Sequence, residues 1–183
     1  MNKVQLNSFN NSWYNPGSRL TIILWFIANR VFINTYFPIP SSFKRIVLNL
    51  FGAKIEKRVL FKPKISIKYP WLLEIQNDVW IGENVWIDNL SKVTIGSNVC
   101  ISQGAMLLCG NHNYKKTTFD LMLGEIKLEE GVWIGAQSIV CPGVTCESHS
   151  VLSVGSIATS DLEAYHIYQG NPAVKIKSRS VEK

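Results

Sequence analysis

The stretch VWIGAQSIVCPGVTCESHSVLSVGSIAT, residues 132–159, repeats with a period of six. Apolar side chains recur at Ile134, Val140, Cys146 and Leu152. An amphipathic helix would place them about 3.6 residues apart, and a half-buried strand would place them at every second residue. Neither pattern fits, so the sequence predicts a repeating structural unit of six residues.

The same period begins upstream, at Ile75. The first place of each unit is apolar: Ile75, Ile81, Ile95, Ile101, Ile134, Val140, Cys146 and Leu152. The fifth place is always small or narrow: Val79, Val85, Val99, Ala105, Ser138, Val144, Ser150 and Ser156. This pattern is typical of a solenoid, in which each unit is a short strand followed by a corner and three units close one triangular coil. The first-place side chains are then expected to point inward. We expect glycine at the second place, as in Gly82, Gly96 and Gly135, to relieve a tight bend.

Two interruptions of the period predict irregular segments. Ile87 and Ile95 are eight residues apart, which predicts a two-residue bulge near Asn89. Leu107 and Ile134 are 27 residues apart, which is one coil of eighteen plus about nine. A loop is therefore expected at about residues 110–125, with the sequence GNHNYKKTTFDLMLGE. Loops that project from a rigid scaffold often carry the chemistry of a protein.

The N-terminal part has a different character. Residues 1–19 are polar and predict an arm, and residues 20–37 and 42–51 predict two helices separated by Pro38 and Pro40. Residues 20–29 are apolar but too few to span a bilayer, which takes about 20 such residues. We interpret them as a helix packed on the main domain. The alternative is a helix on a membrane surface, assisted by basic side chains: Lys44, Arg45, Lys54, Lys57 and Arg58.

Composition sets broad limits on function. The 183 residues have a net charge of +6, a hydrophobic share of 46% and a charged share of only 17%. The low charged share suggests a surface covered by partner subunits or a membrane. The positive charge fits a phosphorylated cofactor, an acidic glycan or an anionic membrane face. Without zinc-finger spacing, an RNA-binding aromatic motif or a dense basic run, nucleic acid is not an expected partner. The four cysteines form no C-x-x-C pair, which indicates free thiols in a reducing cytoplasm.

Several motifs in this order resemble the hexapeptide-repeat acyltransferases. They are the repeat itself, GNHNY in the loop, VWIGAQSIVCPGV and the closing GNPA. FGAKI (residues 51–55), YPW (69–71) and DNLSKVTIG (88–96) resemble the branch of colanic-acid-type polysaccharide O-acetyltransferases, which is related to the galactoside, maltose and nodulation-factor enzymes. The resemblance covers about residues 50–180. It implies a mainly β fold, a left-handed parallel β-helix that assembles as a homotrimer. The implied divisions are an N-terminal arm with helices (1–58), the β-helix domain (59–168) and a C-terminal basic segment (169–183).

The resemblance also implies a mechanism and a set of site residues. His112 is the expected general base, which takes the proton of an acceptor hydroxyl as that hydroxyl attacks acetyl-CoA directly. Asn84 and Trp133 are the expected substrate-binding residues, although a corner asparagine and packing between coils would also explain them. The expected cofactor-binding residues are Gly135, Ala136, Val154, Thr159, Ser160, Val174 and Lys177. Lys175, Lys177 and Arg179 are candidates for the nucleotide phosphates, unless they form only a solvated basic tail.

The expected activity is O-acetylation of a sugar hydroxyl in a surface-polysaccharide or glycan precursor, without a metal. Alternatives are N-acetylation of an amino-sugar nucleotide, a non-enzymatic solenoid, and a zinc-binding solenoid, which would need three clustered histidines. Cys109 lies three residues before His112 and could form an acyl-cysteine, but we interpret it as a thiol that lines the coil. The protein is expected in the cytoplasm, with contact to the inner face of the membrane as a further hypothesis.

Overall fold

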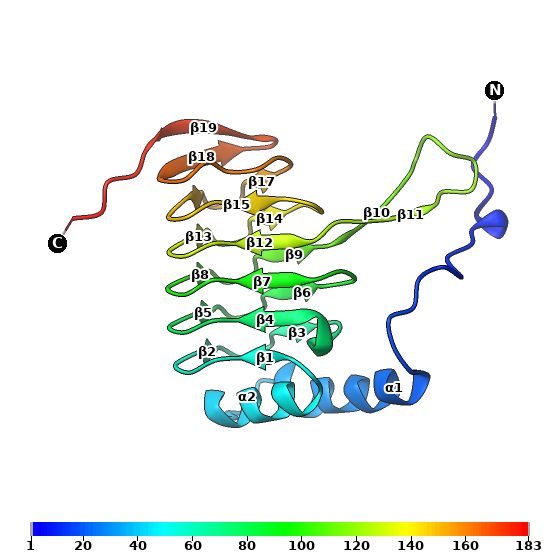
Figure 1. The fold of residues 1–183 in the computed structure, drawn as a ribbon, viewed down its shortest axis with the longest axis horizontal. Helices are drawn as coiled ribbons and strands as arrows, with labels where there is room; N and C mark the ends of the chain where they lie inside the picture. Colours follow the sequence, from blue (N-terminus) through cyan, green and yellow to red (C-terminus); the bar gives the residue numbers. More distant parts are fainter. Residues whose placement is uncertain (1, 183) are drawn as a thin grey trace.

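The computed structural model describes residues 2–182, and its centre is a three-sided β-solenoid. Two short helices lie at the base and a hairpin projects sideways (Figure 1). The front strands run leftward as the chain climbs from base to top, so the coil is left-handed, as the resemblance implied. General rules for crossover connections favour the opposite hand.

Each side of the solenoid is a parallel sheet of very short strands. The first sheet contains β1 (Lys54–Ile55), β4 (Leu73–Ile75), β7 (Val93–Ile95), β12 (Ile126–Leu128) and β15 (Thr145–Cys146). The second contains β2 (Leu60–Phe61), β5 (Trp80–Ile81), β8 (Cys100–Ile101), β13 (Trp133–Ile134), β16 (Val151–Leu152) and β18 (His166–Gly170), with β19 (Ala173–Ser178) antiparallel at its edge. The third contains β3 (Ser66–Ile67), β6 (Trp86–Asp88), β9 (Met106–Leu108), β14 (Ile139–Val140) and β17 (Ile157–Ala158).

The inward side chains stack in one column per sheet. In the second sheet the paired residues are Phe61, Ile81, Ile101, Ile134, Leu152 and Tyr168. Every first-place residue predicted from the six-residue period is at most 1% exposed, and every fifth-place residue is at most 2% exposed. Both predictions are therefore confirmed. The solenoid starts one coil before Ile75, at Ile55, because an eight-residue corner between Ile67 and Ile75 interrupts the period.

The second-place glycines have a different role from the one expected. None of Gly82, Gly96 and Gly135 has a positive φ, so a tight bend is not the reason for them. A Cβ at Gly82 would lie 2.5 Å from the backbone nitrogen of Gln103, and one at Gly135 would lie 2.5 Å from that of Val154. Both contacts join neighbouring coils. Glycine is needed here because the backbones of successive coils approach too closely for a side chain.

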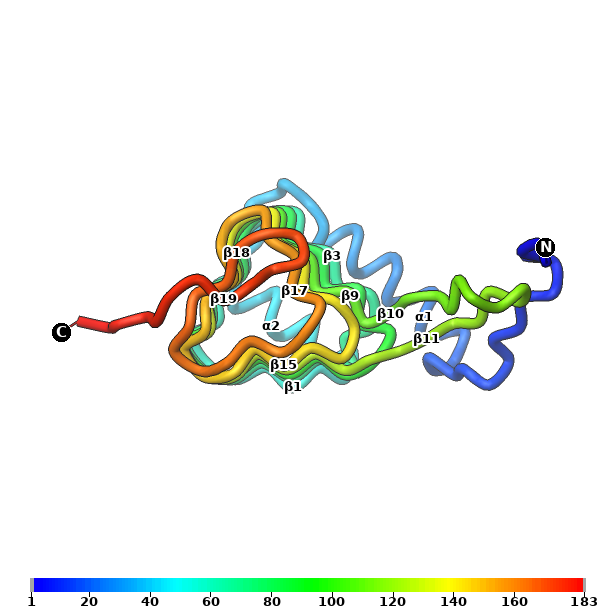
Figure 2. Tube along the Cα trace, turned by 90° about the horizontal axis from the view of Figure 1, so that it is seen from above, coloured from blue at the N-terminus to red at the C-terminus, as the bar shows by residue number. Residues whose placement is uncertain are grey.

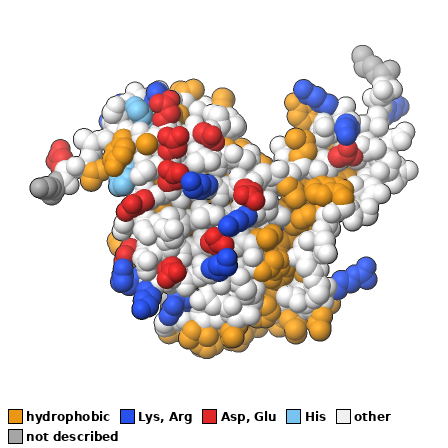
Figure 3. Space-filling model, in the orientation of Figure 1, with side chains coloured by type: hydrophobic (Ala, Val, Ile, Leu, Met, Phe, Trp, Pro, Cys, Tyr) orange, Lys and Arg blue, Asp and Glu red, His pale blue; other side chains and the backbone are white. Residues whose placement is uncertain are grey.

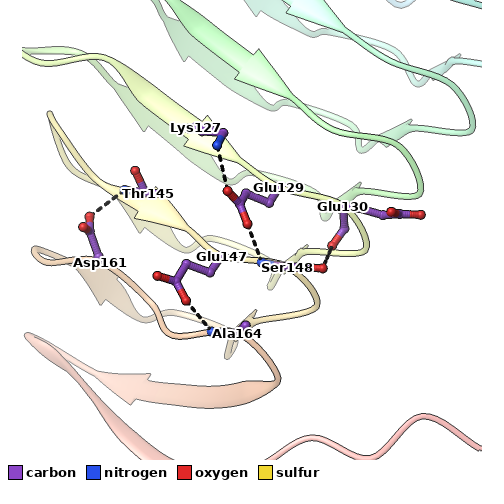
Figure 4. Close-up of polar contacts among 8 residues, drawn as sticks. All are labelled: Lys127, Glu129, Glu130, Thr145, Glu147, Ser148, Asp161 and Ala164. Carbon is purple, nitrogen blue, oxygen red and sulfur yellow. Dashed lines mark hydrogen bonds and ion pairs between the residues drawn. The ribbon is translucent and has the colours of Figure 1, made fainter.

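Polar side chains connect successive coils along the first sheet (Figure 4). The backbone N–H of Thr145 donates to Asp161 at 2.7 Å, and that of Ala164 donates to Glu147 at 2.9 Å. Glu129 accepts a hydrogen bond from the N–H of Ser148 in the next coil at 3.1 Å. These carboxylates satisfy N–H groups in the edge strand β15 and in the corners that have no backbone partner in the ladder.

The N-terminal segment runs beside the projecting hairpin and then covers the base of the solenoid with its helices (Figure 1). It contains a 3₁₀ turn (Leu6–Ser8), α1 (Arg19–Ala28), a π-helical turn (Asn29–Ile33) and α2 (Ser41–Leu50), and a further 3₁₀ turn (Pro70–Leu72) lies in a corner. The predicted second helix is confirmed, whereas the first ends at Ala28 and continues only as the π-helical turn, because Asn34 leaves the helical conformation ahead of Pro38. No helix in residues 2–182 has the length and apolar character needed to cross a bilayer.

The predicted bulge near Asn89 is a buried polar anchor. Asn89 is 0% exposed, and its Oδ1 accepts hydrogen bonds from the backbone N–H groups of Lys68, at 3.2 Å, and Tyr69, at 3.0 Å. Its Nδ2 donates to the carbonyl of Tyr69. One side chain therefore satisfies three backbone groups where two eight-residue corners are stacked.

Replacing Asn89 with alanine should lower the free energy of unfolding by about 2–4 kcal/mol, because buried N–H groups would lose their acceptor. Denaturant unfolding followed by circular dichroism measures this. Asn77→Ala is the matched control, since Asn77 accepts one exposed backbone hydrogen bond, from Lys57, at 3.2 Å. Its cost should stay below about 1 kcal/mol because water replaces the amide. Equal losses in the two variants would contradict the anchoring role.

Candidate active site

The predicted loop is an antiparallel hairpin. β10 (Gly110–His112) pairs with β11 (Leu121–Leu123), and the hairpin leaves the solenoid between the third and the first sheet. The N-terminal arm runs alongside it, as Figures 1 and 2 show. The backbone N–H of Gln5 donates to the carbonyl of Thr117 at 2.8 Å, and the hydroxyl of Tyr14 donates to the carbonyl of Leu90 at 2.7 Å. Two segments far apart in sequence therefore form one projecting unit.

His112 is held in one orientation within this unit. Its Nδ1 lies 2.9 Å from the carbonyl oxygen of Phe119. A carbonyl can only accept, so Nδ1 carries the proton of the neutral ring and Nε2 keeps its lone pair. The imidazole stacks on the Phe119 ring, with centroids 4.4 Å apart and an angle of 7°, and Phe9 of the arm meets it edge-on at 5.6 Å. The ring is thus oriented with one nitrogen available as a base.

The backbone of Phe119 is strained. Its φ is +52°, in the left-handed region that a bulky residue rarely adopts. The same residue supplies both the carbonyl that binds His112 Nδ1 and the ring that stacks on the imidazole. Strain of this kind persists only where surrounding contacts enforce it, and it is concentrated at functional sites. Neither Phe119 nor Phe9 has a periodic or motif signal in the sequence, and sequence reasoning missed both.

A cleft of about 910 Å³ lies over the upper part of the second sheet. Five of the residues predicted for the site line it: Trp133, Gly135, Ala136, Val154 and Lys177. Arg179 lines it as well, and its Nη1 donates to the carbonyls of Gly131, at 2.9 Å, and His149, at 3.0 Å. Trp133 is 47% exposed and donates from Nε1 to Ser102 Oγ at 2.9 Å. The cleft therefore combines an aromatic wall, exposed backbone and two cationic side chains.

The other predicted binding residues lie outside this lining. Thr159 and Ser160 are exposed after β17 on the third sheet, and Val174 is exposed on β19. Lys175 forms an ion pair with Glu163 at 2.7 Å. The predicted basic tail is thus largely a strand, β19, and of the three candidate phosphate ligands Lys177 and Arg179 face the cleft.

Asn84 occupies the corner between β5 and β6, where its backbone has a φ of +58°. Corresponding corners in other coils also have a positive φ, at Lys64, Gly104, Gln137 and Gly155. Asparagine tolerates this conformation better than most residues, so the corner geometry alone accounts for its presence. The corner of Asn84 and the hairpin of His112 are at different edges of the solenoid.

Within one chain His112 does not face the cleft. None of the cleft residues belongs to the hairpin, and Figure 2 shows β10 and β11 on the opposite side of the solenoid from β18 and β19. The predicted base and the predicted cofactor groove can therefore meet only if two copies of the chain lie side by side.

The remaining thiols and histidines are packed in other ways. Cys109 is 0% exposed, and burial raises the pKa of its thiol to about 11. His149 stacks on Tyr165 at 4.8 Å, and His166 Nδ1 lies 2.8 Å from the carbonyl of Ala164. Among residues 2–182 no group of three His, Cys, Asp or Glu side chains is arranged to hold a metal ion.

Comparisons with known proteins agree with this geometry. No protein-family model matches the chain. The chain is 31% identical over 166 residues to WcaF of Escherichia coli K12, which is described as a colanic acid biosynthesis acetyltransferase. The matched residues are 91% of each chain. A hexapeptide-repeat acetyltransferase of Vibrio cholerae, solved with acetyl-CoA, has a TM-score of 0.79 at 19% identity and covers 91% of this chain and 93% of its own. A maltose O-acetyltransferase of Clostridium difficile has a TM-score of 0.75 at 20% identity, with 90% of each chain covered.

A left-handed solenoid with a histidine hairpin and a glycine-lined cleft fits the class of solenoid acyltransferases. The chain belongs to the hexapeptide-repeat acetyltransferase family, because its likeness to WcaF extends over nearly the whole of both chains. The protein is accordingly an acyltransferase.

Replacing Cys109 with serine should leave acetyl transfer within about twofold of wild type, because a thiol with a pKa of about 11 has almost no thiolate at neutral pH. The rate of free-thiol release from acetyl-CoA measures this. Complete loss of turnover in a variant that keeps the wild-type circular dichroism spectrum would instead indicate an acyl-cysteine intermediate.

Proposed function

We propose that the protein transfers the acetyl group of acetyl-CoA to a sugar hydroxyl of a surface-polysaccharide or glycan precursor. The observation that carries this proposal is the orientation of His112, whose Nδ1 is bound to a carbonyl while Nε2 is free to accept a proton. A neutral imidazole with a free nitrogen can accept the proton of a hydroxyl, and histidine is the most frequent general base in enzymes. The similarity to WcaF supports a polysaccharide precursor as the acceptor.

The cleft residues suit coenzyme A. Val154 and Ile176 offer apolar contact for a pantetheine arm, and Lys177 and Arg179 offer positive charge for nucleotide phosphates. The thioester, once bound, supplies an activated acetyl group. Backbone N–H groups near Gly135 and Ala136 are proposed to stabilise the oxyanion as the acceptor hydroxyl attacks. Trp133 and Asn84 are proposed to contact the acceptor.

We further propose that the active site forms between copies of a homotrimer. The outward positions of the second and third sheets carry exposed aromatic side chains, with Trp80 62%, Trp86 42% and Trp133 47% exposed. The outward positions of the first sheet carry ion pairs instead, such as Lys54 with Glu74 at 2.9 Å. The aromatic sheets are therefore the surfaces suited to subunit contact, which would bring the hairpin of one copy to the cleft of the next.

The second candidate acceptor is the amino group of an amino-sugar nucleotide, because the same base and the same cleft would serve it. We also propose that the protein acts in the cytoplasm, where it would meet acetyl-CoA, and that it contacts the inner face of the membrane. A panel of free sugars and amino-sugar nucleotides, assayed by thiol release, distinguishes the two acceptors.

His112→Ala should lower kcat by about 10²- to 10⁴-fold, the usual contribution of a general base. The affinity for acetyl-CoA, measured by calorimetry, should change little because no residue of the hairpin is among those that line the cleft. His166→Ala is the matched control, since that ring also binds a backbone carbonyl through Nδ1 but lies away from the hairpin. Undiminished turnover by His112→Ala would refute the assignment of the base.

The shared site predicts complementation between two inactive variants. His112→Ala lacks the base, and Ala136→Trp fills the cleft. When the two variants are co-expressed, about a quarter of the contacts between subunits should pair an intact hairpin with an intact cleft. Activity should therefore return to about a quarter of the wild-type value. Mixing the two purified variants without subunit exchange is the control. No recovery in mixed trimers confirmed by mass would mean that each chain holds a complete site.

A further inference from the structure

The first helix is apolar on both of its sides. Trp25 and Ala28 face the solenoid and are buried. On the opposite side, side chains three or four residues apart form an exposed stripe: Leu20 67%, Ile23 58%, Leu24 50% and Ile27 55%. A surface helix of a globular protein normally has a polar outer side, and a helix that is apolar all round belongs in a core or against lipid. The outer stripe of α1 therefore lacks a partner within this chain.

The second helix extends this surface. Phe43 is 43% exposed, Ile46 52% and Leu50 79%, again at intervals of three and four residues. Tyr36 and Phe37, in the connection between the helices, are 64% and 71% exposed. Figure 3 shows hydrophobic side chains along the whole lower edge of the molecule, beneath α1 and α2. We call this surface the base face, and it consists of Leu20, Ile23, Leu24, Ile27, Val31, Tyr36, Phe37, Phe43, Ile46 and Leu50.

The excess charge of the protein lies in the same segment. Residues 1–55 contain six Lys or Arg and no Asp or Glu, whereas residues 56–183 contain 13 of each and are neutral. Arg19 and Arg30 are exposed at the two ends of the α1 stripe. Three of the six cations do not belong to this surface: Lys3 is on the arm, Lys54 pairs with Glu74 at 2.9 Å, and Lys44 is 1% exposed with its Nζ donating to the carbonyls of Phe61 and Lys62. The arginines of the two helices, Arg19, Arg30 and Arg45, are the cations that accompany the exposed apolar side chains, and residues 1–55 contain no acidic residue to offset them.

We propose that the base face docks on an anionic phospholipid membrane. Apolar side chains flanked by arginine, without any acidic residue, are the features of interfacial membrane helices. Base-to-base contact with a second copy is disfavoured because it would bring two such positive segments together. In a trimer of parallel solenoids the three base faces would lie on the same side and could contact one membrane together. The trimer would then bind the membrane more tightly than a single copy.

Flotation of the full-length protein with vesicles tests this proposal. Wild type should bind vesicles of phosphatidylcholine with 30% phosphatidylglycerol, and binding should weaken at least tenfold between about 50 and 500 mM salt. The double variant Ile23→Ser, Ile27→Ser should lose at least tenfold in binding. Leu6→Ser is the matched control, because Leu6 is 65% exposed on the arm, away from the base face, and this variant should bind as wild type does.

A second variant covers the case in which the serine variant misfolds. Arg19→Gln with Arg30→Gln changes only exposed charges, and it should weaken binding to the anionic vesicles at least threefold. Acetyl transfer to a water-soluble acceptor should be unchanged in both variants, which separates docking from the proposed chemistry. Three results would overturn the proposal: no binding by wild type, equal binding by all variants, or a changed oligomeric mass of the Ile23, Ile27 variant, which would mean that a second copy covers the stripe.

Discussion

The structure depends on the stacking of inward side chains along three columns. Each strand is only two or three residues long along most of the solenoid and could not persist alone. Stacked coils give each short strand within a sheet two hydrogen-bonded neighbours, and they bury its inward side chains against the equivalent side chains above and below. The close approach of backbones at Gly82 and Gly135 follows from the same stacking. A side chain at either position would separate the coils and open the column.

The segments that depart from the regular solenoid are the ones that form the candidate catalytic region. The hairpin breaks the period, leaves the core and carries the oriented imidazole. The N-terminal arm, about a hundred residues earlier in the sequence, contacts this hairpin. The strained φ of Phe119 belongs to the same small region. A regular scaffold can stabilise such a segment because the columns below it contribute stability that the hairpin does not have to supply.

The surfaces of the solenoid differ in chemistry. The first sheet carries ion pairs and carboxylates that bind corner N–H groups, so it is suited to water. The other two sheets carry tryptophans, and the base carries exposed apolar side chains together with arginines and no acidic residue. Since the core columns occupy only inward positions, the outward positions are free to differ in this way.

The sequence by itself determined the repeat, its three-sided coil and the interruptions near Asn89 and after Cys109, because a period of six leaves one inward residue per unit. It also located His112 in the projecting segment and Gly135 in the stacked core. Only the tertiary structure decided that Phe119 and Phe9 hold the imidazole, that Cys109 is buried, and that Thr159 and Ser160 lie away from the cleft. These features depend on contacts between distant segments, which follow no period along the chain.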